Sequence, residues 1–399
     1  MNKKQLFVAL LLLLMITPCS VWAQKKELNQ ARSYIKAGND KELEKAVTLM
    51  TDLLKIDKNR TNEKIYLTWY EAVREQYRLA NERLYLKQKQ DTAAFFALNR
   101  RMFTILETLD SLDARPDAKG RVKPSYRERH SEALTPYRAN IYNAGIFFLR
   151  KSEYKKAFDE FEFYLNTAEQ PLFTAQDFLK NDPRMPEVAY WAVYCGYKLH
   201  DPLLTLRYRK RALRDTAKIS YTLQYMAEAR HWLNDEELYL KTLETGFHYD
   251  PTSTYFYPRL MDAYSRQEQY DKALALTDSA IAVCDTCELY LFAKSTMLYR
   301  LKRYGECIKV SDQVIAINPK AAEAYFNAGT GYLNIALKLD ERKDKKQMRQ
   351  LYQKARPYME QYRKLMPDEK QKWGPALYRI YLNLNMGRQF DEIDRLLKK

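Results

Sequence analysis

The clearest structural pattern in the chain lies in residues 291–332, LFAKSTMLYRLKRYGECIKVSDQVIAINPKAAEAYFNAGTGY. Apolar and aromatic residues recur at helical spacing on both sides of a polar turn, and Pro319 follows the second run. A proline ends a helix because it lacks the amide hydrogen and clashes with the preceding turn. The stretch therefore predicts two helices, a stop, and a third helix that contains Tyr325.

The same pattern recurs at a constant interval along the chain. The step from Tyr257 to Leu291 equals the step from Leu291 to Tyr325, and Tyr270 and Tyr304 share that spacing. Small residues suit places where two helices cross closely, and they recur within the pattern at Gly145, Ala157, Ala273 and Gly329. Because a single helix pair cannot bury its apolar face, the units are expected to stack on one another.

This pattern resembles the tetratricopeptide repeat (TPR), a helix–turn–helix unit of about 34 residues. The resemblance covers most of residues 138–399 and implies about six to seven repeats. It also implies an all-α fold, a right-handed superhelical solenoid of TPR-like repeats. Extra residues near 170–186 and 334–346 interrupt the period, and we expect the second insertion to lengthen its two helices or to form a basic loop.

The region before the array is predicted to be helical too. Residues 24–112 contain a degenerate TPR-like repeat followed by two long amphipathic stretches. Residues 113–137 combine Pro, Gly and charge without periodicity, so we expect a basic flexible linker and a domain boundary there.

Residues 1–23 have the order of a secretory signal peptide. Lys3 and Lys4 precede an apolar core at 6–16, and Val21 and Ala23 place small residues before the predicted cleavage. The sequence thus predicts secretion across the inner membrane and a periplasmic location. Lipid anchoring at Cys19 is not expected, because a small residue should precede a lipidated cysteine and Pro18 stands there.

Composition limits the classes of partner. Lys and Arg number 67 against 51 Asp and Glu, a net charge of +16, which favours an acidic protein partner or an anionic envelope surface. We expect no nucleic acid partner, since an exported protein seldom meets one. Only 10 glycines are present, which argues against Gly-rich phosphate-binding loops.

The sequence predicts no enzyme. The four histidines form no pair at zinc-binding helical spacing, and no nucleophile elbow, Walker loop or dinucleotide fingerprint is present. We therefore expect no catalytic residue, no metal and no cofactor.

Cys284 and Cys287 form a C-x-x-C motif with three open interpretations: a local disulfide, a redox dithiol or half of a metal site. Cys195 and Cys307 fall at helix-packing positions, where buried free thiols are expected.

The resemblance implies that a partner binds along the concave groove, which is lined by first-helix residues of each repeat. Aromatic, Arg and Asn side chains are favoured in such contacts. By the register of the TPR family the predicted partner-binding residues are Tyr142, Asn143, Tyr221, Tyr225, Tyr255, Arg259, Phe292, Tyr299, Arg300, Phe326 and Asn327.

The sequence thus favours a non-enzymatic periplasmic scaffold for protein–protein interaction. Two alternatives remain open. One is an envelope assembly factor that acts at the outer-membrane surface through its basic regions. The other is a thiol-redox protein built on the C-x-x-C motif.

Overall fold

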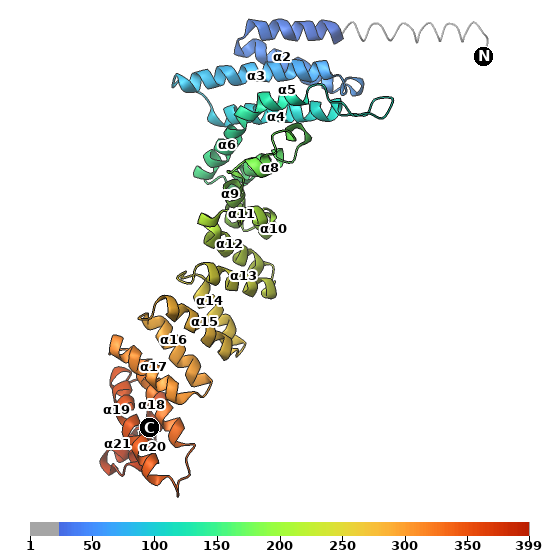
Figure 1. The fold of residues 1–399 in the computed structure, drawn as a ribbon. Helices are drawn as coiled ribbons and strands as arrows, with labels where there is room; N and C mark the ends of the chain where they lie inside the picture. The colour runs from blue at the N-terminus through green and yellow to red at the C-terminus, as the bar shows by residue number, and fades with distance from the viewer. Residues whose placement is uncertain (1–23, 399) are drawn as a thin grey trace, which may run out of the picture. The chain divides into compact units, whose positions relative to one another are not determined.

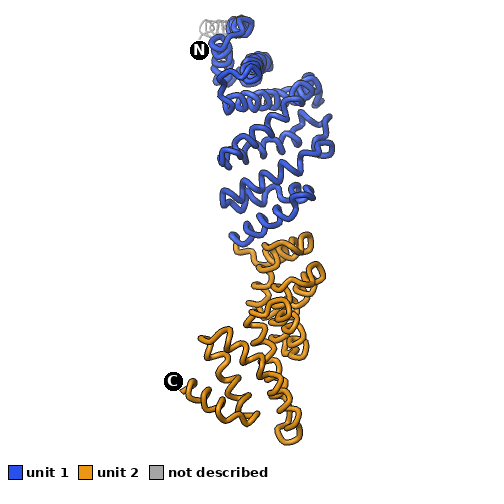
Figure 2. Tube along the Cα trace, turned by 90° about the vertical axis from the view of Figure 1, so that its left-hand side faces the viewer, with its two compact units in different colours: residues 1–233 blue, residues 234–399 orange. Residues whose placement is uncertain are grey.

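The computed structural model describes residues 24–398, and the predicted signal peptide and Cys19 lie outside this range. Within it the chain is all-α, without a β-strand, as the sequence predicts (Figure 1). No helix among these residues is long and apolar enough to cross a membrane. The chain divides into two compact units, unit 1 up to Leu233 and unit 2 from Asn234 (Figure 2).

Unit 1 begins with helical residues 24–37 and continues in hairpins of neighbouring helices. Its further helices are α2 (Asp40–Leu54), α3 (Glu63–Tyr85), α4 (Thr92–Asp113), α5 (Arg127–Leu134), α6 (Arg138–Arg150), α7 (Tyr154–Thr167), α8 (Phe178–Asn181), α9 (Met185–Lys198), α10 (Pro202–Arg207), α11 (Arg209–Ala212) and α12 (Ile219–Trp232).

Unit 2 contains hairpins of the same kind. Its helices are α13 (Glu236–Tyr249), α14 (Phe256–Arg266), α15 (Tyr270–Val283), α16 (Glu288–Arg300), α17 (Tyr304–Ile317), α18 (Ala322–Ala336), α19 (Lys345–Leu365), α20 (Lys370–Asn383) and α21 (Gly387–Leu397).

The repeat period of the sequence is present in the backbone itself. The turns before α10, α13, α15 and α17 each contain a residue with positive φ, and these residues are evenly spaced along the chain: His200, Asn234, Glu268 and Lys302, with φ of 53°, 54°, 54° and 60°. A left-handed residue just after a helix satisfies its last carbonyl groups and reverses the chain. The repeated conformation therefore sets where each second helix begins.

Two glycines lie where the sequence predicts close helix crossings. A Cβ atom at Gly145 would lie 2.4 Å from the Phe161 ring of α7, and one at Gly329 would lie 2.5 Å from the Met359 sulfur of α19. The fully buried rings of Phe103, Phe158 and Phe161 fill the core of unit 1. Small and large residues thus alternate across the helix contacts, as close packing requires.

The insertion near 170–186 is ordered around a buried arginine. It contains the 3₁₀ turn Pro171–Phe173 and the short helix α8. Arg138 of α6 is 5% exposed, and its guanidinium pairs with Asp182 and donates from Nε to Thr167 Oγ1 at 3.0 Å. The guanidinium also lies 3.7 Å from the centre of the Tyr164 ring and 4.1 Å from that of Phe178. This cluster holds the insertion against α6 and α7.

Residues 113–137, expected to be a flexible linker, contain helix α5. Arg127 donates from Nε and Nη2 to both carboxylate oxygens of Asp110 on α4, at 2.8 and 2.9 Å. His130 is buried and stacks on Tyr126 with ring centres 5.5 Å apart. The segment is therefore tied to α4, and the two compact units divide at Leu233 and Asn234 rather than here.

The insertion near 334–346 takes both forms that the sequence allows. Residues 337–344 form a loop after α18, and α19 is then 21 residues long, compared with 14 for α17.

Candidate functional site

Aromatic residues form a stripe along α9. Glu187, Tyr190, Trp191, Tyr194 and Tyr197 follow the helical pattern i, i+3, i+4, i+7 and i+10, which places them on one side of the helix. Tyr190 is buried, whereas Trp191, Tyr194 and Tyr197 are half-buried. Since polar residues usually occupy the solvent side of a helix, partly exposed rings in this arrangement point to a binding surface.

Rings from α12 complete the surface. Tyr225 lies between Tyr194 and Tyr197, with ring centres 5.6 and 4.6 Å away, and Trp232 stacks on Tyr197 at 5.7 Å. Tyr154 of α7 meets Tyr194 edge-on at 6.2 Å. Aromatic pairs in such geometries contribute about 0.5–1.5 kcal/mol beyond their buried area. We call this surface the aromatic face, and define it as Tyr154, Trp191, Tyr194, Tyr197, Tyr225 and Trp232.

Two lysines lie over these rings. The Lys198 ammonium is 5.9 Å from the centre of the Tyr154 ring and 5.7 Å from that of Tyr194. The Lys218 ammonium is 5.0 Å from the Tyr190 ring and 5.2 Å from the Trp191 ring. A cation over an aromatic ring is attracted by the negative face of the ring. Lys218 also lies 3.7 Å from carboxylate oxygens of Glu187 and Asp215, whereas Lys198 is exposed, so the positive charge at the border of the aromatic face comes mainly from Lys198.

Glu187 connects the aromatic face to α6. Its Oε1 accepts a hydrogen bond from the Tyr142 hydroxyl at 3.0 Å and one from Trp191 Nε1 at 3.4 Å, and Lys218 Nζ lies 3.7 Å away. Burial and the hydrogen bond to Glu187 raise the pKa of Tyr142, so this hydroxyl stays protonated and donates. The carboxylate thus fixes the orientation of one ring from α6 and one from α9.

The arrangement suits binding. Flat apolar rings with cations at the border can hold a partner by area and charge, without a reacting group. Within residues 24–398 no group of three or more His, Cys, Asp and Glu side chains could hold a metal ion.

Three of the predicted partner-binding residues lie at or beside the aromatic face. Tyr225 is part of it, Tyr142 reaches it through Glu187, and Tyr221 is 54% exposed one turn before Tyr225 on α12. Asn143 is exposed on α6, and its Nδ2 donates to Asn140 Oδ1 at 3.1 Å.

Five residues of the face were not among those predicted: Tyr154, Trp191, Tyr194, Tyr197 and Trp232. The insertion at 170–186 shifts the repeat register, so the family positions could not be carried onto α9. The helical spacing of aromatic residues in 190–197 is the signal that could have identified the three residues on α9.

The predicted residues of unit 2 are distributed over three helices. Tyr255 lies directly before α14 and Arg259 on it, and the guanidinium carbon is 3.7 Å from the centre of the Tyr255 ring. Asn327 of α18 is only 7% exposed, and its Nδ2 donates to Ser295 Oγ at 3.1 Å.

The remaining predicted residues of unit 2 lie on α16 and α18. The Phe326 ring packs on Tyr362 with ring centres 5.1 Å apart, so this side chain contributes to packing between helices. Phe292 and Tyr299 are half-buried on α16, and Arg300 is exposed at its end.

The four cysteines within residues 24–398 are free thiols. Cys195 and Cys307 are buried, as predicted, and burial raises the pKa of Cys195 to about 12 and that of Cys307 to about 11. Cys284 is exposed in the turn after α15, and Cys287 is half-exposed directly before α16. The oxidation state of this pair remains a prediction.

Comparison with known proteins finds similar solved structures at low identity. The C-terminal part of the TPR repeat-containing protein of Cytophaga hutchinsonii is 14% identical, with 63% of this chain and 92% of that chain covered and a TM-score of 0.39. MamA of Desulfovibrio magneticus is 15% identical, with 47% and 97% covered and a TM-score of 0.32. A thermophilic TPR protein of Thermus thermophilus is 19% identical, with 49% and 99% covered and a TM-score of 0.24. No protein-family model and no curated protein matches the sequence.

Since all three TM-scores lie below 0.5, the architecture rests on this chain's own helices and on the even spacing of its turns. The described residues form an all-α array of TPR-like helical hairpins.

Proposed function

We propose that this protein is a non-enzymatic scaffold of the periplasm, which binds a partner protein on the aromatic face of unit 1. The observation that supports the proposal is the set of six contacting, half-buried rings on α7, α9 and α12. Tyr and Trp dominate binding energy at protein interfaces because each buries a large area at a small cost in conformational entropy.

Preorganisation favours the same role. The rings support one another, and Glu187 is hydrogen-bonded to Tyr142 and Trp191 before any partner arrives. A partner that docks on ordered side chains loses little conformational entropy, so more of the contact energy contributes to affinity. The exposed Lys198 at the border and the net charge of +16 favour an acidic surface on the partner.

The proposal is tested by cross-linking the tagged protein in cells of its source and identifying what is bound to it. Three baits are compared: the parent, a Trp191→Ala/Trp232→Ala variant, and a Tyr85→Ala/Tyr249→Ala control. Tyr85 and Tyr249 are 85% and 58% exposed and lie outside the aromatic face. A partner protein retained by the parent and the control but lost from the first variant supports the proposal. Equal recovery by all three baits excludes the aromatic face as the site.

The location is tested separately. The proposal expects the mature protein in the periplasmic fraction, with an N-terminal peptide that begins at Gln24 in mass spectrometry. Uncleaved protein in the cytoplasmic fraction would exclude export.

A further inference from the structure

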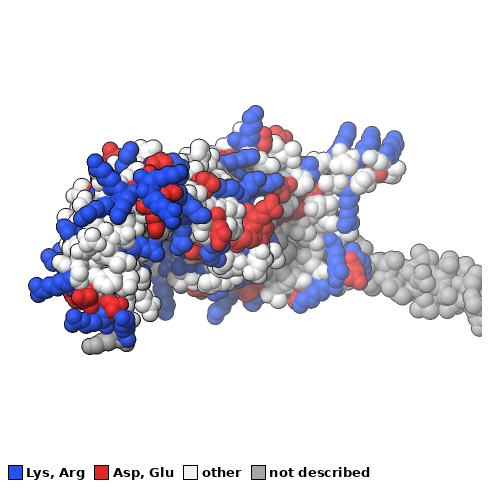
Figure 3. Space-filling model, turned by 90° about the horizontal axis from the view of Figure 1, so that it is seen from below, with Lys and Arg blue, Asp and Glu red and all other residues white. Residues whose placement is uncertain are grey.

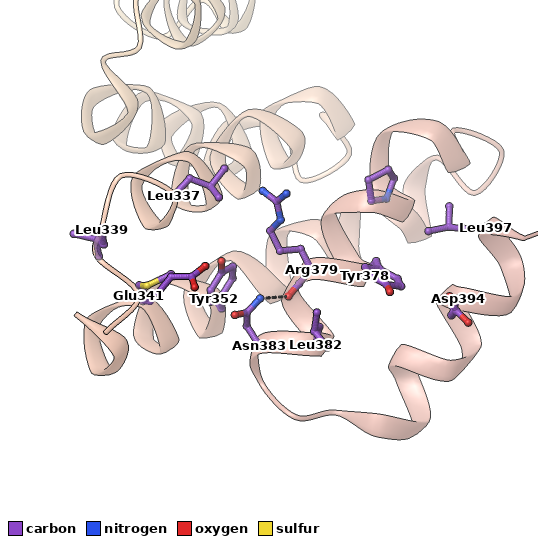
Figure 4. Close-up of a pocket in the computed structure, with 12 residues that line it drawn as sticks. Leu337, Leu339, Glu341, Tyr352, Tyr378, Arg379, Leu382, Asn383, Asp394 and Leu397 are labelled. Carbon is purple, nitrogen blue, oxygen red and sulfur yellow. Dashed lines mark hydrogen bonds between the residues drawn. The ribbon is translucent and has the colours of Figure 1, made fainter. Parts of the chain in front are cut away.

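A cavity of about 610 Å³ lies in the last hairpin of unit 2, far along the chain from the aromatic face (Figure 4). Its walls come from the loop after α18, from α19, and from one side of α20 and α21. Leu337, Leu382 and Leu397 line it and are 52%, 52% and 41% exposed. A concave site of this volume with exposed leucines is large enough to hold a ligand or a short segment of a partner.

The α16–α17 hairpin shows which element packs on the corresponding surface of another hairpin. Lys302 and Asn385 are the positive-φ residues of the α16–α17 and α20–α21 turns, so the two hairpins can be matched residue by residue through them. The match pairs Ser295, Thr296, Tyr299, Ser311 and Val314 with Tyr378, Arg379, Leu382, Asp394 and Leu397. All five residues of the second set line the cavity.

In the α16–α17 hairpin, helix α18 covers these positions. Asn327 of α18 donates to Ser295 Oγ at 3.1 Å and to Thr296 Oγ1 at 3.4 Å, and Asn334 of α18 donates to the Tyr299 hydroxyl at 3.3 Å. Ser311 and Val314 are fully buried. In the last hairpin, Leu382 takes the place of Tyr299 and Leu397 that of Val314; both are exposed, and no helix among the described residues covers them. The cavity is therefore shaped for a helix that lies as α18 lies on α16–α17.

Charge indicates what kind of helix fits. Arg379 is exposed at the cavity, and it forms no ion pair with a carboxylate of the described residues. Of the two carboxylates in the lining, Asp394 already pairs with Lys398 at 2.6 Å. Glu341 lies in residues 337–346, which carry five Lys and Arg against three Asp and Glu, so this wall of the cavity is positively charged in sum. Figure 3 shows the C-terminal end of the chain, where Lys and Arg side chains are prominent. The net charge of +16 makes a second copy of this basic chain a poorer occupant than an acidic partner.

We infer that this cavity is a docking site for an acidic amphipathic helix of a second protein. The apolar side of the helix would lie on Leu337, Leu382 and Leu397, and a carboxylate beside it would pair with Arg379. Helix-in-groove recognition of this kind uses apolar residues at positions i, i+3, i+4 and i+7. The site is separate from the aromatic face, so it would give the scaffold a second partner surface.

The test uses the full mature chain and a labelled synthetic helix of about 18 residues, with a Leu stripe and Glu on its flanks. Fluorescence anisotropy is expected to show saturable binding to the parent. Leu382→Asp should weaken binding about tenfold, since it places a charge against the apolar stripe. Arg379→Glu should weaken binding of the Glu peptide. The same variant should strengthen binding of a matched peptide that has Lys in place of Glu. A Leu289→Asp control, at a position 56% exposed on α16 outside the cavity, should bind like the parent.

Three results would overturn the inference. The first is no binding of the Glu peptide to the parent. The second is equal loss in Leu382→Asp and Leu289→Asp, since the cavity would then not be the site. The third is a parent dimer in sedimentation that Leu382→Asp converts to monomer, because the occupant would then be a second copy. Circular dichroism melting of each variant shows that the fold is retained.

Discussion

Replacing Arg138 by methionine should destabilise unit 1 strongly. The side chain of Arg138 is 6% exposed and that of its partner Asp182 is 10% exposed. Besides that ion pair, the guanidinium donates from Nη2 to the Tyr164 carbonyl at 3.2 Å and lies over two aromatic rings. Methionine retains much of the side-chain length and removes the charge and the donors.

The size of the stability loss follows from the Asp182 carboxylate, which loses its ion-pair partner. Without Arg138, the Asp182 carboxylate stays in a poorly solvated place with only the Tyr164 hydroxyl and the Arg184 amide as donors. Burial opposes the ionisation of Asp182, and at present hydrogen bonds, first that from Arg138, hold its pKa below the ordinary value. Breaking a buried ion pair on one side typically costs about 3–5 kcal/mol. We expect a loss at the lower end of this range, since Asp182 keeps two donors.

The assay is urea unfolding together with hydrogen exchange of residues 171–185. Arg138→Met should lower the free energy of unfolding by about 3 kcal/mol and speed exchange in this segment. Arg121→Met is the control, because the Arg121–Asp117 pair is exposed to solvent and should contribute little to stability. The double variant Arg138→Met/Asp182→Leu should lose less than the single one, since no buried charge is left. An Arg138→Met variant within about 0.5 kcal/mol of the parent would refute this reasoning.

Four further substitutions test other parts of the fold by urea unfolding. Burial raises the pKa of Glu107 to about 7, although the nearby Arg100 lowers it. The folded state therefore holds a proton that the unfolded chain releases, and stability falls as the pH rises from about 4.5 to 7. The free energy of unfolding of Glu107→Gln should exceed that of the parent by on the order of 2 kcal/mol at pH 8 and equal it at pH 4. An equal difference between the two proteins at both pH values would contradict this. Gly196→Ala should cost about 2 kcal/mol or more, since its Cβ would lie 2.4 Å from the Thr205 backbone nitrogen. Gly305→Ala, with open space around the Cβ, should raise the free energy of unfolding by about 0.5 kcal/mol. Equal effects of Gly196→Ala and Gly305→Ala would show that the close approach to Thr205 does not matter for stability. Glu268→Gly should raise the free energy of unfolding by up to about 1 kcal/mol, because φ is +54° at this position. A lower free energy of unfolding would mean that the Glu268 side chain stabilises the fold by more than the backbone strain costs.

The repeat architecture could be predicted because its packing imposes residue types at fixed offsets. Tyr270 and Tyr304, one repeat period apart in the sequence, are the first residues of α15 and α17. Gly145 and Gly329 are small because a neighbouring side chain occupies the space of a Cβ. A repeated contact leaves a repeated pattern, so one sequence contains several examples of the same constraint.

The order of residues 113–137 could not be predicted in this way. The segment has the local composition of a loop, and its helix α5 is fixed by Arg127 pairing with Asp110, 17 residues earlier. Long-range ion pairs leave no periodic signal, so local composition suggested flexibility where a tertiary contact provides order.

The candidate site was predicted in part for a related reason. Tyr142, Tyr221 and Tyr225 were found through the repeat register, whereas the residues of α9 lie after an insertion that interrupts this register. Asn327 was expected in the groove, but its amide bonds to Ser295 and Thr296 place it between helices. A register states which side of a helix a residue occupies and does not state how far the next helix covers it.

The buried arginine and the aromatic face are connected through α6 and α9. Arg138 and Tyr142 are one turn apart on α6, and Asp182 and Glu187 lie just before and just inside the start of α9. Two polar contacts, Arg138–Asp182 and Tyr142–Glu187, therefore hold the start of α9 against α6. Glu187 in turn orients Trp191. Loss of the Arg138–Asp182 contact should loosen the Tyr142–Glu187 contact. Arg138→Met is therefore expected to disturb the rings of the aromatic face, although Arg138 is not part of it.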